Sequence, residues 1–113
     1  MKQNLSLYRG DSKTYTIRFR NSAGTALNIT GWIITLTIKR SFDDPDISAV
    51  FQKIVTPDDP THGICTITLE NSDTQNFPIS VCHYDIQAKT DVSKIYTIII
   101  GQYHILEDVT RAH

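Results

Sequence analysis

The stretch GWIITLTIK, residues 31 to 39, decides the fold class of this chain, because apolar and polar side chains alternate along it with the period of a β-strand. Neighbouring side chains of a strand point to opposite faces of its sheet. One face of this strand therefore carries Trp32, Ile34, Leu36 and Ile38. We expect that face to lie against the core of a β-sheet protein.

Similar short runs lie on both sides of this stretch, and turn-forming residues separate them. About seven strands are predicted, at residues 5–8, 14–20, 31–39, 49–55, 64–69, 81–89 and 95–106. Before the sixth, Asn71 or Ser72 can cap one helical turn that ends before Pro78, with Phe77 turning back toward the core. This spacing is typical of a β-sandwich or barrel.

Composition supports one all-β domain over residues 1–113. The chain has 16 Ile and 14 Thr against five Ala and six Leu, and β-branched residues fit a pleated sheet better than a helix. A chain of 113 residues is long enough for one hydrophobic core and too short for two. We expect the core to contain Tyr15, Ile17, Phe19, Trp32, Ile34, Leu36, Ile38, Cys65, Ile67, Leu69, Tyr84, Ile86, Ile98 and Ile100.

Charge and hydropathy argue against several classes of partner. Lys and Arg number 11 and Asp and Glu 12, which leaves no basic excess to hold nucleic acid or an anionic membrane surface. Residues 1–5 lack the apolar core of a signal peptide, and no apolar run approaches the roughly 18 residues of a membrane helix. Cys65 and Cys82 are expected to be free thiols, because a core of this size needs no disulfide and the compartment is expected to be reducing.

The order of the turn and strand motifs is similar to that of a known family. Gly10-Asp11-Ser12 precedes an alternating strand, and LNITGW at 27–32 opens the next. GICTITL at 63–69 is followed by Asp73-Thr74, and the chain closes with YDI at 84–86, YTIIIG at 96–101 and DVTR at 108–111. Over about residues 5–111 this order resembles the immunoglobulin-like N-terminal domain of phage baseplate upper proteins.

The resemblance implies an immunoglobulin-like antiparallel β-sandwich and a structural role in assembly, with no catalytic residues to carry over. It implies other phage or prophage tail and baseplate proteins as partners, a homo-oligomer, and a location in the virion tail or, during assembly, the host cytoplasm. Family members often place Pro-Gly before the Tyr of the sixth strand, whereas ISVCH at 79–83 follows Pro78 here. Many members also continue into a stalk or receptor-binding region, so a docking module alone, or a small accessory tail protein, is expected.

The residues themselves offer no catalytic set. Cys82 and His83 are neighbours on a strand, so they point to opposite faces and cannot share a proton. No glycine pattern for holding phosphate occurs in the chain. Tyr84 is expected to act structurally, with its hydroxyl bonded to the backbone of the preceding corner, as is common in sandwich domains.

Metal and adhesion motifs are equally incomplete. His62 lies near Asp58 and Asp59 in a loop, and Pro57 and Pro60 already account for this loop as a turn. The loop offers too few convergent ligands to bind a metal. The run DDPD at 43–46 lacks the spacing and the closing Glu of a helical calcium loop. Arg9-Gly10-Asp11 is interpreted as a turn rather than an adhesion signal. We expect no metal, no cofactor and no enzymatic activity.

A candidate interface follows from the pairing of the last hairpin. With residues 91–93 as its turn, residues of the sixth and seventh strands pair when their numbers sum to about 184, which sets His83 opposite Gly101 and His104 opposite Ser80. If Cys82, Tyr84, Ile86 and Ala88 face the core, then so do their partners Gln102, Ile100, Ile98 and Tyr96. The opposite face would carry an apolar patch of Ile33, Val81, Ile95, Ile99, Tyr103 and Ile105.

Contiguous exposed apolar surface of this kind usually marks a protein interface, so the patch is the predicted docking or self-association face. Two other interpretations stay open: the C-terminal tail or a loop covers the patch, or the inward and outward sets are exchanged. The leading functional hypothesis is a non-enzymatic structural module of a phage or prophage tail or baseplate. The alternatives are a carbohydrate- or receptor-binding module, which needs exposed aromatic side chains, and a small hydrolase, which needs a nucleophile with its base.

Overall fold

The computed structural model describes residues 2–41, 43–45 and 49–107. Within them lie the strands β1 (Leu5–Tyr8), β2 (Lys13–Arg18), β3 (Ile33–Lys39), β4 (Phe51–Val55), β5 (Ile64–Leu69), β6 (Val81–Lys89) and β7 (Ile95–Leu106). A 3-10 turn, η2 (Pro60–His62), precedes β5, and one turn of helix, α1 (Asn71–Thr74), follows it. The predicted all-β class and the short helical turn are confirmed. Asp46 of the DDPD run and the DVTR motif at 108–111 lie outside the described residues.

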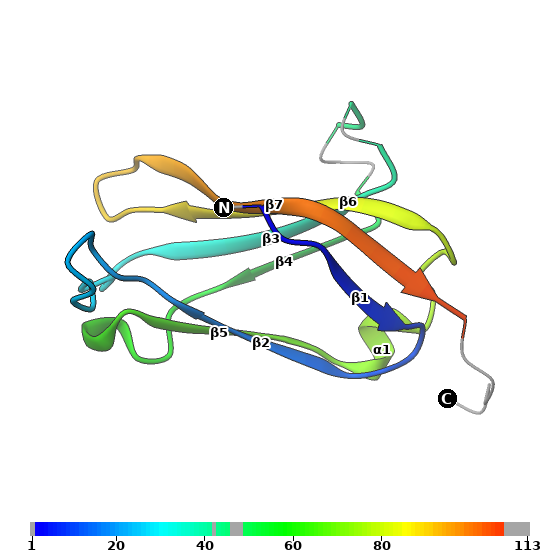
Figure 1. Cartoon of the computed structure of the whole chain (residues 1–113), viewed down its shortest axis with the longest axis horizontal. Coiled ribbons are helices and arrows are strands. Elements are labelled where there is room, and N and C mark those ends of the chain that lie inside the picture. Colours follow the sequence, from blue (N-terminus) through cyan, green and yellow to red (C-terminus); the bar gives the residue numbers. More distant parts are fainter. Residues whose placement is uncertain (1, 42, 46–48, 108–113) are drawn as a thin grey trace.

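The strands form two layers that face each other (Figure 1). One sheet has the strand order β1-β7-β6-β3-β4, and the other consists of β2 and β5. With β2 and β5 in one layer and β3, β6 and β7 in the other, the strands take the places of B and E, and of C, F and G, in an immunoglobulin sandwich. The predicted immunoglobulin-like sandwich is therefore confirmed as a fold.

The sandwich departs from the predicted antiparallel pattern at one edge. β1 runs parallel to β7, with Leu5 opposite Tyr103 and Tyr8 opposite Leu106, while the other strand pairs are antiparallel. The reason is the route of the chain: β1 ends in a turn that takes it across to β2 in the other layer. A strand that leaves its sheet in this way is not bound to the antiparallel geometry of a hairpin.

The core lies between the two layers and matches most of the predicted set. The buried members of that set are Ile17, Phe19, Ile34, Leu36, Ile38, Cys65, Ile67, Leu69, Tyr84 and Ile86. Tyr15, Trp32 and Ile98 are half-buried against them. Ile100 is exposed, and the prediction for it was wrong. Phe77 turns into the core as expected, and both cysteines are buried free thiols, also as expected.

The turn after β1 is fixed by α1. Gly10 takes the left-handed conformation with φ 88°, and the amide of Asp11 donates to the carbonyl of Tyr8. The buried hydroxyl of Thr74 in α1 donates to the carbonyl of Asp11 at 2.8 Å. Arg9-Gly10-Asp11 is therefore a turn held against the helix, as predicted. The helix cap differs from the prediction, because Glu70, and not Asn71 or Ser72, is the N-cap residue.

The N-terminal segment before β1 is held against the inner side of β7. The amide of Gln3 donates to the carbonyl of Ile100, and the hydroxyl of Tyr84 donates to the carbonyl of Gln3 at 2.6 Å. Gly101 makes this approach possible, because any Cβ at that position would overlap the Gln3 carbonyl. The structural role predicted for Tyr84 is confirmed, but its partner is the N-terminal segment rather than the preceding corner.

Three tyrosines meet at this point of the core. The hydroxyls of Tyr15 and Tyr103 lie 2.5 Å apart, and the ring of Tyr103 packs edge-on against those of Tyr15 and Tyr84. Burial raises the pKa of Tyr84 to about 12 and also raises the pKa values of Tyr15 and Tyr103. The cluster links β2 in one layer to β6 and β7 in the other, and this second layer carries the candidate site. None of the described helices is long or apolar enough to cross a membrane.

Candidate docking surface

The candidate site is the face of the five-stranded sheet that points away from β2 and β5. In β6 buried and accessible residues alternate along the whole strand, and β3 follows the same pattern with Thr37 also buried. The strand register brings the outward residues into rows across the sheet. Ile33, Lys89 and Ile95 form the row nearest the β6–β7 turn. Ser6, Val81 and His104 form a row near the opposite end.

A β-bulge in β7 changes which of its residues reach this face. Between Lys89 and Gln87 the pairing follows the predicted sum of 184, with Lys89 opposite Ile95. From Ile86 onward the register is shifted by one, because β7 carries one extra residue, Ile98, between the partners of Gln87 and Ile86. His83 is consequently opposite Gln102 rather than Gly101, and the predicted pairing of the far half of β7 was wrong by one residue.

The shift moves half of the predicted interface into the core. Tyr103 and Ile105 have exposed fractions of 0% and 1%, and Ile99 is half-buried against the core. The predicted exposure of these three side chains was therefore wrong, because a one-residue slip sends each of them to the other face of the sheet. For this half of β7 the interpretation with exchanged inward and outward sets is the correct one. Ile33, Val81 and Ile95 are exposed as predicted.

The three correctly placed residues do not form one patch. Ile33 and Ile95 flank Lys89, whereas Val81 lies eight residues further along β6, which is about 26 Å at the rise of a strand. The polar side chains between them include Thr35, Thr37, Gln52, Asp85 and Gln87. The predicted contiguous stripe is thus two apolar groups at opposite ends of a polar face.

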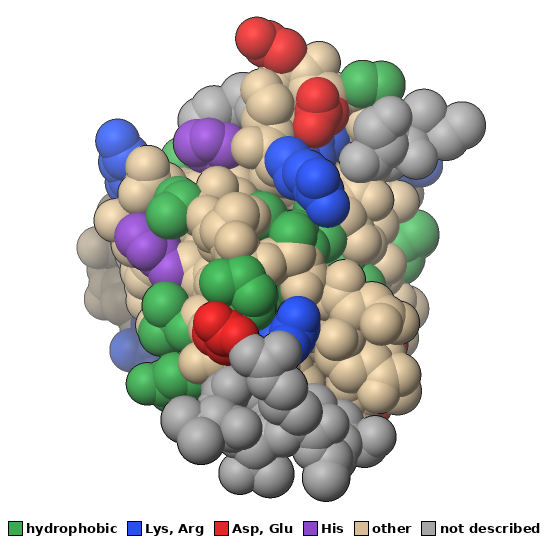
Figure 2. Space-filling model, turned by 90° about the vertical axis from the view of Figure 1, so that its right-hand side faces the viewer, with side chains coloured by type: hydrophobic (Ala, Val, Ile, Leu, Met, Phe, Trp, Pro, Cys, Tyr) green, Lys and Arg blue, Asp and Glu red, His purple; other side chains and the backbone are tan. Residues whose placement is uncertain are grey.

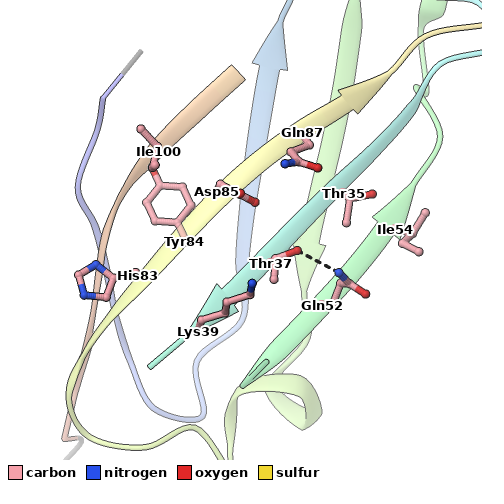
Figure 3. Close-up of a pocket in the computed structure, with 10 residues that line it drawn as sticks. All are labelled: Thr35, Thr37, Lys39, Gln52, Ile54, His83, Tyr84, Asp85, Gln87 and Ile100. Carbon is pink, nitrogen blue, oxygen red and sulfur yellow. Dashed lines mark hydrogen bonds between the residues drawn. The ribbon is translucent and has the colours of Figure 1, made fainter. Parts of the chain in front are cut away.

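The polar middle of the face forms an open groove of about 310 Å³ (Figure 3). Side chains of β3, β4 and β6 point into it, and the amide of Gln52 donates to the hydroxyl of Thr37 at 3.0 Å. Ile54 of β4 and Ile100 of β7 border it on either side. Lys39, His83 and Asp85 add ionisable groups, but no group of three or more His, Cys, Asp or Glu side chains suited to a metal occurs among the described residues.

Sequence reasoning missed further exposed apolar residues at the two ends of the sheet. Val92 in the turn is exposed, and Tyr96 is half exposed although it lies on the predicted, core side of the sheet, opposite the buried Ala88. Tyr96 is half exposed because β1 pairs only with the far half of β7, which leaves residues 95–97 at the sheet edge. At the other end Tyr8 pairs with Leu106, and both are exposed, as is Ile79 just before β6. Their separation in sequence hid this second group.

Of the other candidate residues, only His83 reaches this face. His62 lies on η2 with its Nδ1 atom 2.9 Å from an Asp59 carboxylate oxygen, an exposed pair within one turn. Cys82 is buried on the inner face of β6, whereas its neighbour His83 points to the outer groove, so the two side chains lie on opposite faces as predicted. Burial and the nearby Asp58 carboxylate raise the pKa of the Cys65 thiol to about 11. A thiol with that pKa is a poor nucleophile near neutral pH.

Comparison with solved structures finds a similar fold in a phage protein. The chain superimposes on the N-terminal domain of ORF48 of phage TP901-1 with a TM-score of 0.56, covering 93% of this chain and 86% of that one. The sequences are 10% identical over the match, so the likeness is one of fold. No protein-family model matches the chain, and no curated protein is similar to it in sequence.

Proposed function

We propose that this domain is a non-enzymatic structural module of a phage or prophage tail or baseplate, which docks onto other tail proteins and associates with copies of itself. Two observations support the proposal. The order of the turn and strand motifs resembles that of the immunoglobulin-like domain of baseplate upper proteins. The fold, compared separately, is similar to that of a domain from a phage protein. The fold likeness carries the proposal, because immunoglobulin-like folds serve many functions and this match has a phage source.

The distribution of exposed apolar side chains also favours a docking role. Ile95 and Val92 have exposed fractions of 62% and 68%, beside each other at one end of a short domain. Apolar side chains that gather in this way, rather than occurring singly, are characteristic of protein contact surfaces. The buried thiols and the polar groove offer no activated nucleophile, so assembly is a better proposal than hydrolysis.

The carbohydrate-binding alternative receives less support. A sugar platform needs aromatic rings that lie together and exposed. The exposed tyrosines, Tyr8 and Tyr96, sit at opposite ends of the sheet, and Tyr84 at the groove is buried. Binding of a defined glycan to the purified domain, lost on changing a groove residue such as Gln52, would move the assignment to this alternative.

The test of the proposed function is location and partnership in the particle. The chain would be co-expressed with the products of the genes beside its own, and the purified mixture analysed by size-exclusion chromatography. We expect a stable complex with at least one tail protein, and we expect gold-labelled antibodies against the chain to decorate the tail tip of the particle. Label confined to heads, or a complete lack of label on particles together with no complex, would contradict the proposal.

A further inference from the structure

The two-stranded sheet of β2 and β5 has an open edge on its β2 side. In an immunoglobulin sandwich this sheet has the strand order A-B-E-D, so strand A lies beside the position that β2 takes here. In this chain the first strand, β1, pairs with β7 in the other layer instead. Figure 1 shows β2 and β5 together in the lower layer, and none of the described strands pairs with the other side of β2. The described chain thus fills the positions of B and E but not that of A.

The backbone groups along this edge point outward. The amide of Phe19, just after β2, donates to the carbonyl of Gly63, just before β5, and so continues the pairing of the two strands. The odd-numbered residues of β2 therefore turn their N–H and C=O groups toward β5. Because this direction alternates from one residue to the next, the groups of Thr14, Thr16 and Arg18 point away from it. The side chains of these three residues are exposed, and an open edge of this kind is a ready template for another strand.

The opposite edge of the same sheet, along β5, is protected. Ile64 exchanges two backbone hydrogen bonds with Asp59, and the ammonium group of Lys53 in β4 donates to the carbonyl of Thr68. A lysine at a strand edge is a common means of preventing pairing with another chain. The outward side chains of β5 are accordingly half-buried, whereas those of β2 are exposed.

The edges of the five-stranded sheet are less suited to a partner strand. β1 is four residues long, and the carbonyl of Tyr8 at its end already accepts from the amide of Asp11. The part of β7 that β1 leaves without a neighbour, residues 95–97, is shorter still. β4 carries a single charged residue, Lys53, whose ammonium group is engaged with β5 and α1. The six residues of β2 therefore offer the longest open edge in the described part of the chain.

The charged side chains on the outward face of β2 are all positive. The outward residues, which alternate with the buried Ile17 and Phe19, are Thr14, Thr16, Arg18 and Arg20. On β5 the partner of Arg18 is the uncharged Ile64. The carboxylate that does reach this face, that of Asp58, accepts from the hydroxyl of Thr66 on β5 at 3.2 Å, away from the open edge. The structure records no ion pair between either arginine and a described residue.

This single sign of charge is a local property of β2. The whole chain has a net charge of −1. Figure 2 looks onto the end of the molecule where β1 and β7 finish, and acidic, basic and hydrophobic side chains are mixed there. A guanidinium group binds a carboxylate through two parallel hydrogen bonds, so the arginines of β2 select an acidic partner. Because Arg18 and Arg20 are two residues apart, the matching acids on a partner strand are also two residues apart.

We propose that the open edge of β2 docks an extended segment of another protein, which runs antiparallel to β2 and carries acidic side chains at the two alternate positions opposite Arg18 and Arg20. Strand addition of this kind gains affinity from the backbone hydrogen bonds and specificity from alternate side chains. The described strands contain one acid in all, Asp85 of β6, so no strand of a second copy fits this pattern. The proposal specifies the partner contact of the proposed docking role and rests on that role for its biological setting.

A synthetic peptide tests the proposal on the purified domain. The probe is EVEVTVT, capped at both ends, which in antiparallel alignment places its glutamates opposite Arg20 and Arg18 and its threonines opposite Thr16 and Thr14. In a titration followed by amide NMR spectra, we expect saturable shifts and slower hydrogen exchange at the amides of Thr14, Thr16 and Arg18. The peptide KVKVTVT should bind roughly tenfold more weakly, because two cross-strand attractions become repulsions.

A charge-reversed variant tests the arginines. Arg18→Glu with Arg20→Glu should exchange the preference, so that the lysine peptide binds more tightly than the glutamate peptide. Lys89→Glu with Lys94→Glu is the matched control, because it changes the net charge equally at exposed positions of the other layer. This control should keep the wild-type preference. If the arginine variant does not fold, the comparison of the two peptides on the wild type decides the question of charge.

Two further changes test the backbone pairing without altering charge. A glutamate peptide N-methylated at its second glutamate and first threonine lacks the amides that face Arg18 and Thr16, and it should lose binding. Thr16→Pro removes an N–H group from the open edge, where proline is tolerated because no ladder bond is lost. The folded variant should likewise fail to bind. Circular dichroism reports its folding, and the N-methylated peptide decides if it is unfolded.

Four results would overturn the proposal. They are the absence of saturable shifts at millimolar peptide, equal binding of the glutamate and lysine peptides, undiminished binding of the N-methylated peptide, and shifts centred on β1 or β4. The first of these would mean that the arginines serve to keep the edge unpaired. Any of the four leaves a location of the chain in the tail untouched. Likewise, an absence of the chain from particles would end the proposed function without changing the peptide result.

Discussion

The two halves of β7 differ although their sequences look alike. Residues 95–97 pair with β6 on one side and with none of the described strands on the other, and all three side chains are exposed. In the other half Tyr103 and His104 pair with both β6 and β1, and Gly101, Tyr103 and Ile105 are buried in strict alternation. The boundary is the bulge at Ile98. One inserted residue thus decides which apolar side chains form the core and which form a surface.

The position of the bulge, and with it the division of the predicted patch, could not be predicted from the sequence. Ile98, Ile99 and Ile100 are identical residues, so the alternation of polarity gives no sign of where the register changes. The pairing that fits the hairpin turn fails three residues later because the bulge turns every following side chain over. A core that closes around Tyr103 stabilises the shifted register.

The largest difference between the halves is expected from one pair of aspartate variants. Ile105→Asp would bury an unpaired carboxylate and should cost more than about 4 kcal/mol, enough to unfold much of the protein. Ile95→Asp in the exposed half should change stability by less than about 0.5 kcal/mol. Urea unfolding followed by Trp32 fluorescence measures both. Equal losses for the two variants would show that the halves do not differ.

Alkaline pH should act on the buried tyrosines. In the unfolded chain a tyrosine ionises near pH 10, whereas burial raises the pKa of Tyr84 to about 12. Burial also raises the pKa of Tyr103. Because the unfolded state loses its protons first, stability is fully present below about pH 10 and falls as the pH rises toward 12. Unfolding free energies from pH 8 to 12 test this, and Tyr84→Phe should show a shallower fall. A flat profile up to pH 12 would contradict the burial of these hydroxyls.

Gly101→Ala should loosen the N-terminal segment from the buried half of β7. The added Cβ would overlap the carbonyl of Gln3, so either the segment or β7 has to move, at about 1–3 kcal/mol. The sharper measurement is a double-mutant cycle. In a chain that lacks residues 1–4, the same change should cost much less, because its obstacle is gone. An undiminished cost there would place the strain elsewhere in β7.

Tyr84→Phe should have the smallest effect. It removes the hydrogen bond to the Gln3 carbonyl but keeps the ring contact with Tyr103, so about 1 kcal/mol should be lost at neutral pH. Tyr96→Phe, in the exposed half, is the matched control and should be neutral. Hydrogen exchange should speed up at the amides of residues 3 and 102, which are tied to this segment. Slow exchange there after the change would remove the role given to the Tyr84 hydroxyl.

Much of the fold was predictable because local pattern and tertiary packing agree. In β3 and β6 each inward position carries an apolar side chain, and the turns between strands carry glycine, proline or aspartate. The strand positions could therefore be predicted from the two-residue period of the apolar side chains and from the turn-forming residues. The helical turn was placed correctly, but its cap was not, since Glu70 takes a role that Asn or Ser more often fills. Of the candidate interface, the sequence located Ile33, Val81 and Ile95 as exposed residues and misplaced the rest.

By itself, then, the sequence determined an all-β sandwich with a given set of strands, because side-chain alternation and turn chemistry are local properties. The tertiary structure decided three further points: the bulge at Ile98, the parallel edge formed by β1, and the grouping of Tyr8 with Leu106 across nearly the whole chain. Each depends on which strands become neighbours. That choice is made by closing one core around Tyr103 and Ile105, a contact between distant segments that no local pattern encodes.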